Sequence, residues 1–183
     1  NLTFGAIGAS CSKLVHLNLA GTGRSLKESS NVGALVNACG NGLEELVLHH
    51  TQWDVRQYCS LIEACCASLK RLDLSHVRGL DEGVIEFMVG ARLPLLESLL
   101  LRGCSYLGDG ELGKLLQQFP ELETIGLDNV FDVSDATMST FFKAGGDGKT
   151  TKASWRANKL KRLHLPHCQR VSDRSLSLLK GTF

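Results

Sequence analysis

A six-residue pattern recurs along the chain and constrains its fold more than any other feature. The pattern is L-x-x-L-x-L, and it occurs six times in 183 residues, with one isoleucine replacing a leucine. The first leucines of consecutive copies are 29, 26, 27, 26 and 38 residues apart. The apolar positions are Leu14/Leu17/Leu19, Leu43/Leu46/Leu48, Leu69/Leu72/Leu74, Leu96/Leu99/Leu101, Leu122/Ile125/Leu127 and Leu160/Leu163/Leu165. A period in the twenties predicts that one supersecondary unit is copied along the chain.

Each copy predicts one strand and one helix. The last two apolar residues of a hexad alternate with other residues, which is the period of a strand with one buried face. Apolar residues at helical spacing follow, as at Val84, Phe87 and Met88. Because a helix separates consecutive strands, neighbouring strands must pair in parallel. We therefore expect an α/β fold, a leucine-rich-repeat solenoid (horseshoe) with about six parallel strands on its concave face and helices outside.

The turn between strand and helix carries two further features. A small side chain suited to burial follows each hexad, for example Thr51 or Cys104. Four repeats then continue with an apolar residue and a short polar or acidic step, as in Val133, Ser134 and Asp135. Serine or aspartate here can accept hydrogen bonds from the free N–H groups of the first helical turn. We expect these residues to cap the helices.

The sixth copy carries a resemblance to a known family. Residues 163–176 read L-H-L-P-H-C-Q-R-V-S-D-R-S-L, and residues 99–112 follow nearly the same pattern. This pattern resembles the cysteine-containing leucine-rich repeats of F-box/leucine-rich-repeat proteins, which are ribonuclease-inhibitor-like solenoids. The resemblance implies the substrate-recognition repeats of an F-box-type ubiquitin ligase or a related adaptor. No stretch of residues 1–183 resembles an F-box, so we expect that segment elsewhere.

Length and composition predict one domain. We expect residues 1–183 to form a single leucine-rich-repeat domain that belongs to a longer chain. The 20 basic and 19 acidic residues give no strong field for nucleic acid or a membrane surface, and no apolar run of about 20 residues occurs. The seven cysteines include no C-x-x-C pair, which disfavours structural zinc. Reduced thiols predict a cytoplasmic protein, with a nuclear or cytoskeletal location as alternatives.

The spacing of 38 residues indicates an insertion at 143–159, a basic, glycine-rich loop. Tryptophan and arginine are favoured at interfaces, so the loop is predicted either to contact an acidic partner or to be solvated with its tryptophan packed back on the repeat. The candidate contact residues are Lys149, Lys152, Trp155 and Arg156. The G-K-T within the loop is not predicted to bind phosphate. Lys143 stands where a phosphate loop needs glycine, and the order of strand and helix is reversed.

Three histidines share one place in their repeats, immediately before the small side chain. They are His50, His76 and His167. Adjacent strands lie about 4.8 Å apart, so His50 and His76 should be neighbours that can share a metal ion or respond to pH. Alternatively, the position simply favours polar residues that bond to the turn. Gly103 holds the next equivalent place and supplies no third ligand, so we predict no metal and no cofactor.

The concave face is the main candidate site. No nucleophile lies beside a base in the sequence, so we predict that the protein is not an enzyme. The outward side chains of the hexads form mixed-charge rows around Val47 and Leu100, a composition suited to a protein interface or to an unused soluble face. The predicted partner-binding residues are His16, Asn18, Glu45, Val47, His49, Arg71, Asp73, Leu100, Arg102, Asp128, Arg162 and His164.

These features together predict a non-catalytic protein–protein interaction module. We expect protein partners, a place in a hetero-complex, and no binding of nucleic acid or membrane. The resemblance points first to substrate recognition in an F-box-type ubiquitin ligase. The alternative is a structural scaffold subunit of a large cytoskeletal, axonemal or organellar assembly.

Overall fold

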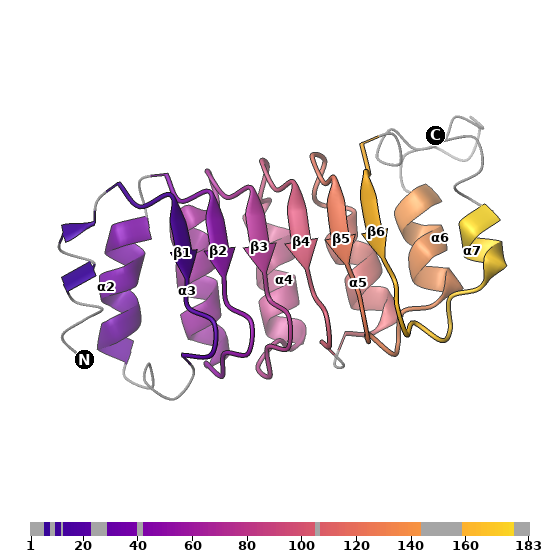
Figure 1. Cartoon of the computed structure of the whole chain (residues 1–183), viewed down its shortest axis with the longest axis horizontal. Helices are drawn as coiled ribbons and strands as arrows, with labels where there is room; N and C mark the ends of the chain where they lie inside the picture. The colour runs from indigo at the N-terminus through magenta and orange to yellow at the C-terminus, as the bar shows by residue number, and fades with distance from the viewer. Residues whose placement is uncertain are drawn as a thin grey trace.

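The computed structural model has an α/β fold in which strands and helices alternate along the chain (Figure 1). It describes residues 6–7, 10–11, 13–22, 29–39, 42–104, 107–143 and 159–177. The strands are β1 (His16–Asn18), β2 (Glu45–Val47), β3 (Arg71–Asp73), β4 (Ser98–Leu100), β5 (Thr124–Gly126) and β6 (Arg162–His164). The helices are α2 (Ser29–Cys39), α3 (Val55–Cys65), α4 (Glu82–Ala91), α5 (Asp109–Leu116), α6 (Asp135–Lys143) and α7 (Asp173–Ser177).

The six strands form one parallel sheet in chain order, β1 to β6, and the sheet does not close on itself. The central leucine of each hexad aligns with its equivalent in the next strand, as Leu46 aligns with both Leu17 and Leu72. Both the six parallel strands and their register were predicted from the hexads, and both are confirmed. Because side chains alternate across a strand, this register places equivalent residues of all repeats on the same face.

The helices lie along one face of the sheet and contact one another in chain order, from α2 to α7 (Figure 1). No described helix covers the opposite face, which we call the open face. Lys143 was predicted as the start of the inserted loop but is the last residue of α6, because the apolar helical stripe through Phe141 and Phe142 continues to that point. Within the described ranges, no helix has the length and apolar character needed to cross a membrane.

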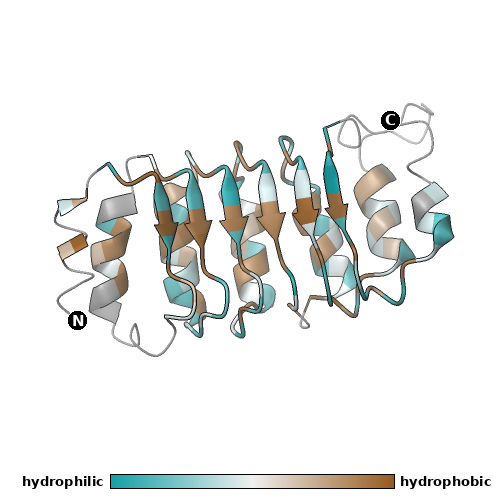
Figure 2. Ribbon diagram, viewed as in Figure 1, coloured by the Kyte–Doolittle hydropathy of each residue, from teal (hydrophilic) through white to brown (hydrophobic). Residues whose placement is uncertain are grey.

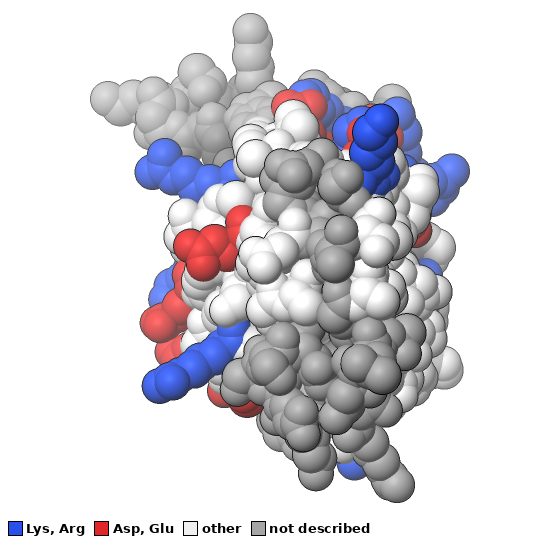
Figure 3. Space-filling view, turned by 90° about the vertical axis from the view of Figure 1, so that its left-hand side faces the viewer, with Lys and Arg blue, Asp and Glu red and all other residues white. Residues whose placement is uncertain are grey.

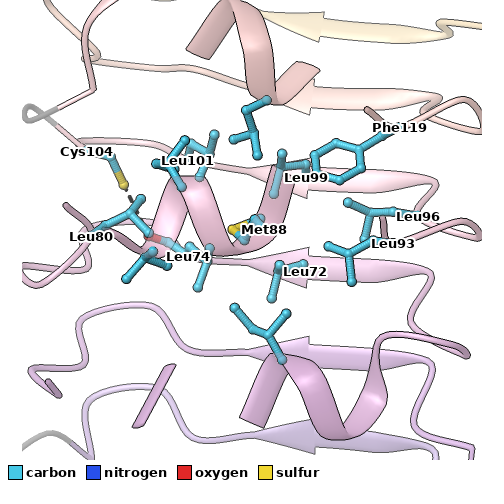
Figure 4. Close-up of a cluster of buried hydrophobic side chains, with 14 of the residues drawn as sticks. Leu72, Leu74, Leu80, Met88, Leu93, Leu96, Leu99, Leu101, Cys104 and Phe119 are labelled. Carbon is cyan, nitrogen blue, oxygen red and sulfur yellow. Dashed lines mark hydrogen bonds between the residues drawn. The ribbon is translucent and has the colours of Figure 1, made fainter. Parts of the chain in front are cut away.

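The core lies between the sheet and the helices. Leu72 and Leu99 from adjacent strands are at most 1% exposed, and Met88 from α4 packs with them (Figure 4). Figure 2 shows the matching band of apolar residues across the strands. The apolar positions of the hexads therefore fill the interior, and the residues between them are left for the open face.

Each strand ends in a tight turn with one residue in the left-handed conformation. In the third repeat the Val77 amide donates to the Leu74 carbonyl (3.3 Å), and His76 between them has a φ of 56°. The equivalent left-handed residues are Gly21, His50, His76, Gly103, Asn129 and His167. Glycine, asparagine and histidine tolerate this conformation better than most residues. The backbone therefore accounts for the histidines, because neither the His50 nor the His76 ring makes a hydrogen bond within the described chain.

The small residue after each turn packs into the core as predicted, except that Thr22 is only partly buried. Cys104 Sγ donates to the Leu74 carbonyl at 3.2 Å (Figure 4), and Cys168 Sγ donates to the Leu127 carbonyl at 3.0 Å. Burial raises the pKa of Cys104 to about 12 and also raises the pKa of Cys168. Both thiols therefore stay protonated and link one repeat to the preceding one as hydrogen-bond donors.

Helix capping follows the prediction at some turns and departs from it at others. Asp81 accepts a hydrogen bond from the Val84 amide and caps α4, and Ser134 accepts one from the Ala136 amide at the start of α6. Asp109 was expected to cap its own helix, but its carboxylate instead accepts hydrogen bonds from the next repeat. The expectation for Asp109 was wrong because its carboxylate is directed toward the neighbouring turn.

Candidate functional site

The open face brings the predicted partner-binding residues into rows. The first row is His16, Glu45, Arg71, Ser98, Thr124 and Arg162, and the second is Asn18, Val47, Asp73, Leu100, Gly126 and His164. Backbone bonds just beyond the strands align a third row, Ala20, His49, Ser75, Arg102, Asp128 and Pro166. All twelve predicted residues are described, and all are at least partly exposed. The site is therefore one continuous strip across six strands.

The apolar centre of the strip is interrupted. Val47 and Leu100 are both partly exposed, but Asp73 lies between them in the register. The Asp73 carboxylate accepts a hydrogen bond from the Ser75 amide at 2.9 Å, which holds it beside the strand end. Gly126 extends the apolar area, because a Cβ there would lie only 2.8 Å from Leu100 Cδ2. The Leu100 side chain therefore extends toward β5 and packs over the backbone of Gly126.

A charged cluster lies in the first row of the strip, on β1, β2 and β3. Glu45 accepts hydrogen bonds from His16 Nδ1 at 2.9 Å and from an Arg71 guanidinium nitrogen at 3.1 Å. Partial burial acts to raise the pKa of Glu45, but the hydrogen bonds and charges of Arg71 and His16 outweigh it, and the pKa is lowered. Such half-exposed pairs contribute little to folding, about 0–1 kcal/mol. They do hold the side chains in defined positions.

A second ion pair lies at the far end of the strands. Arg102 Nε donates to Asp128 Oδ2 at 3.0 Å, and the arginine side chain is 39% exposed. A Cβ at Gly126 would lie 3.3 Å from this Nε, so the same glycine makes room for Arg102. By contrast, the side chains of Arg162 and His164 form no hydrogen bond or ion pair with any described residue. The guanidinium of Arg162 and the ring of His164 thus remain accessible near β6.

Sequence reasoning missed two contributions to this surface. Gly126 was placed in a row but not recognised as the space that Leu100 and Arg102 occupy. Ser75, between His49 and Arg102, has a buried Oγ without a hydrogen-bond partner in the described structure. A glycine within a strand is a known sign of close approach by another group, so Gly126 could have been identified. Nothing in the sequence distinguishes Ser75 from other small residues at strand ends.

The inserted loop and a metal site were the other candidates from the sequence. The loop residues Lys149, Lys152, Trp155 and Arg156 lie outside the described residues. Across the described ranges, no group of three or more histidine, cysteine or acidic side chains is arranged to hold a metal ion. Both signs of charge, with uncharged side chains between them, are visible from the end of the molecule that faces left in Figure 1 (Figure 3). The described surface therefore shows no single-sign patch from this side.

Comparison with known proteins gives a likeness of fold. No protein-family model matches the chain, and no curated protein sequence matches it. Among solved structures, the actin-binding site 2 of leiomodin-1 is similar in fold, with a TM-score of 0.54 and 14% sequence identity. The match covers 77% of this chain and 86% of the leiomodin-1 chain. At this identity the likeness concerns the fold alone.

Proposed function

We propose that the chain is a cysteine-type leucine-rich-repeat solenoid whose open face binds a protein partner without catalysis. The observation that carries the proposal is that alternate residues of each strand have different roles. The hexad leucines are buried in the core, except Leu14, Leu163 and Leu165, which are partly buried against it. The residues between them form a strip of side chains, most of them partly exposed, that the core does not need. Repeat proteins commonly use such extended surfaces for binding.

The composition of the strip supports a protein rather than a small ligand. Val47 and Leu100 supply exposed apolar area, and ion pairs lie near both ends of the strands. Protein interfaces combine an apolar centre with a polar rim. Arg71 and Arg102 are already held by Glu45 and Asp128, so little side-chain freedom is lost when they meet a partner.

Within this proposal, the more specific role is substrate recognition for an F-box-type ubiquitin ligase. Its support is the resemblance of residues 163–176 to the repeats of that family. The second candidate is a scaffold subunit of a cytoskeletal assembly. It gains some support from the leiomodin-1 structure, because the matched part of that protein is named as an actin-binding site.

Charge reversal on the open face tests the proposal. The chain is used to capture partners from cell lysate, and dissociation constants are then measured for each purified partner with wild type, Arg71→Glu and Arg102→Glu. Each variant should weaken binding about tenfold or more, because a buried interfacial charge contact is replaced by repulsion. The melting temperature should change little. Lys114→Glu, on an exposed site of α5, is the matched control and should bind like wild type.

The two specific roles separate in the same experiment. Direct co-sedimentation with filamentous actin would support the cytoskeletal candidate, whereas selective capture of one non-cytoskeletal protein that becomes ubiquitinated would support the ligase role. If both arginine variants bind as tightly as wild type, the open face is not the binding surface.

A further inference from the structure

His50 and His76 form a parallel stack at the end of β2 and β3. Their ring centroids lie 4.6 Å apart, and their planes differ by 3°. Both residues are exposed, and both have the left-handed backbone of the turn. Gly103 permits the arrangement, since a Cβ there would lie 2.2 Å from His76 Nδ1. His49 meets His50 edge-on, with centroids 5.3 Å apart.

The stack borders a polar hollow of about 260 Å³. The hollow is lined by His50, Thr51, Gln52, His76 and Arg78. Arg78 is exposed, and its guanidinium forms no hydrogen bond or ion pair with any residue in the described ranges. The hollow thus gathers two imidazoles and one guanidinium whose donors are unused.

Among the described residues, no carboxylate lines this hollow. Asp54 and Asp81, which start the helices that follow the two turns, direct their oxygens to the amides of Gln57 and Val84. Asp73, at the end of β3, accepts from the Ser75 amide. The nearby acids are therefore engaged with backbone, and the positive groups of the hollow lack an anionic partner within the described structure.

The geometry does not suit a metal ion. The ring-nitrogen lone pairs of two stacked rings lie in two separate parallel planes, whereas the lone pairs of metal ligands must point at one common atom. Parallel rings do suit an oxyanion, because ring N–H groups and a guanidinium can donate together to several oxygens of one group. A phosphate monoester offers three such oxygens and a negative charge.

We propose that His50, His76 and Arg78 form a binding site for a tetrahedral oxyanion of the phosphate-monoester class. Protonation of both stacked rings places two like charges close together, and an anion between them and Arg78 offsets that repulsion. A protonated ring donates from both nitrogens and carries a positive charge, so occupancy should increase as the pH falls. The site goes beyond the proposed protein-binding face and does not depend on it.

Titration of the isotopically labelled chain with sulfate tests the site first. Sulfate keeps its double negative charge over the whole pH range, so any pH dependence belongs to the protein. Histidine ring resonances are followed at constant ionic strength, near pH 6 and near pH 7.5. The expected result is a saturable shift of the His50 and His76 resonances, with affinity about tenfold higher at the lower pH.

Three variants and one control localise the binding. Each of His50→Asn, His76→Asn and Arg78→Gln should lower the affinity about tenfold, since each removes one charge-assisted donor. Asparagine is chosen because Asn129 already occupies the equivalent left-handed place. His167→Asn makes the same change in the sixth repeat, where the preceding equivalent residue is Asn129 and no stack exists, and should leave the affinity unchanged.

A second titration distinguishes the sources of the anion. Inorganic phosphate is compared with a phosphoserine peptide and with the same peptide unphosphorylated. Tighter binding of the phosphopeptide would identify a phosphorylated protein as the natural ligand, whereas equal affinity with inorganic phosphate would identify a free phosphate compound. The proposal is overturned if Arg78→Gln and His76→Asn bind sulfate like wild type, or if all histidines shift alike.

Discussion

The turn after β2 and the turns after β4 and β5 fix the following helix in different ways. After β2 the Tyr58 hydroxyl, buried from solvent, bonds with Thr51 Oγ1 at 3.0 Å and accepts from the Trp53 amide at 3.1 Å. The Tyr58 and Trp53 rings stack with centroids 5.4 Å apart. All these contacts lie within one repeat. The turn is therefore stabilised by the buried Trp53–Tyr58 pair, which we call the aromatic plug.

After β4 and β5 the contacts run from one repeat to the next. Asp109 accepts hydrogen bonds from the Ser134 amide (2.9 Å), from the Ser134 hydroxyl and from the Thr137 hydroxyl. Asp135 does the same with the amide and hydroxyl of Ser172. We call each of these links an aspartate staple. The same repeated fold thus contains two kinds of joint. One is aromatic and lies within a repeat, and the other is a carboxylate that accepts hydrogen bonds from the next repeat.

Removal of the plug should have the largest effect. Tyr58→Ala should lower the free energy of unfolding by about 3–5 kcal/mol, because a fully buried aromatic ring is lost and a cavity remains. Tyr58→Phe keeps the ring and should lower it by only about 1–2 kcal/mol, for the lost hydroxyl bonds. Urea unfolding measures both. Equal losses for the two variants would show that the hydroxyl, not the ring, stabilises the turn.

Removal of a staple should have a smaller effect. Asp109→Ala should lower the free energy of unfolding by about 1–3 kcal/mol, because it leaves the Ser134 amide and two hydroxyls without their acceptor. Asp132→Ala, which removes only an exposed pair with Arg170, is the control and should change stability by less than about 0.5 kcal/mol. If Asp132→Ala lowers the free energy of unfolding as much as Asp109→Ala does, the Asp109 staple does not contribute specifically to stability.

The two kinds of joint should also differ in their response to acid. Partial burial acts to raise the pKa of Asp109, but the Ser134 and Thr137 hydrogen bonds outweigh it and lower the pKa. The Ser172 and Ser175 hydroxyls lower the pKa of Asp135 from 3.8 to about 2. A carboxyl with a lowered folded-state pKa stabilises the fold above its unfolded-state pKa, and this contribution is lost as the pH falls through the folded-state value.

Stability should therefore decline between about pH 4 and pH 2, and the decline should be shallower in the double variant Asp109→Asn/Asp135→Asn. Tyr58→Phe should keep the wild-type slope, since burial raises the pKa of Tyr58 and its hydroxyl stays protonated throughout this range. Urea midpoints at each pH measure the slopes. Parallel slopes for wild type and the double variant would exclude the staples as the acid-sensitive element.

A third staple can be built, and this should have the smallest effect. The equivalent residues between the third and fourth repeats are Glu82 and Gly108, which offer neither the short acid nor the hydroxyl. The double variant Glu82→Asp/Gly108→Ser should raise the free energy of unfolding by about 0.5–1 kcal/mol. The added Cβ at Gly108 meets only the movable Glu111 carboxylate. Each single variant serves as a control and should raise the free energy of unfolding by less than the double variant does.

Much of the fold could be predicted from the sequence because the hexad fixes both period and face. Leu72 and its equivalents predicted six strands, their parallel pairing and their register. The neighbourhood of His50 and His76 followed from strand spacing alone. These features depend on backbone repetition, which a spacing pattern records directly.

The rest depends on side-chain direction, which spacing does not record. Asp109 and Asp81 stand within one position of each other in their repeats, yet one reaches the next repeat and the other caps its own helix. Asp81 is the N-cap residue of α4, whereas Asp109 is the first residue of α5 and follows the N-cap residue Gly108. In the same way, Gly126 shapes the open face only because Leu100 and Arg102 lean over it.

The left-handed residue at each strand end has a consequence for how such a surface can change. Two of these six places hold glycine, three hold histidine and one holds asparagine. Most other replacements would strain the backbone. Substitution at these six strand ends is therefore restricted to a few residue types. Histidine is the only one of the three types present there that can be ionised.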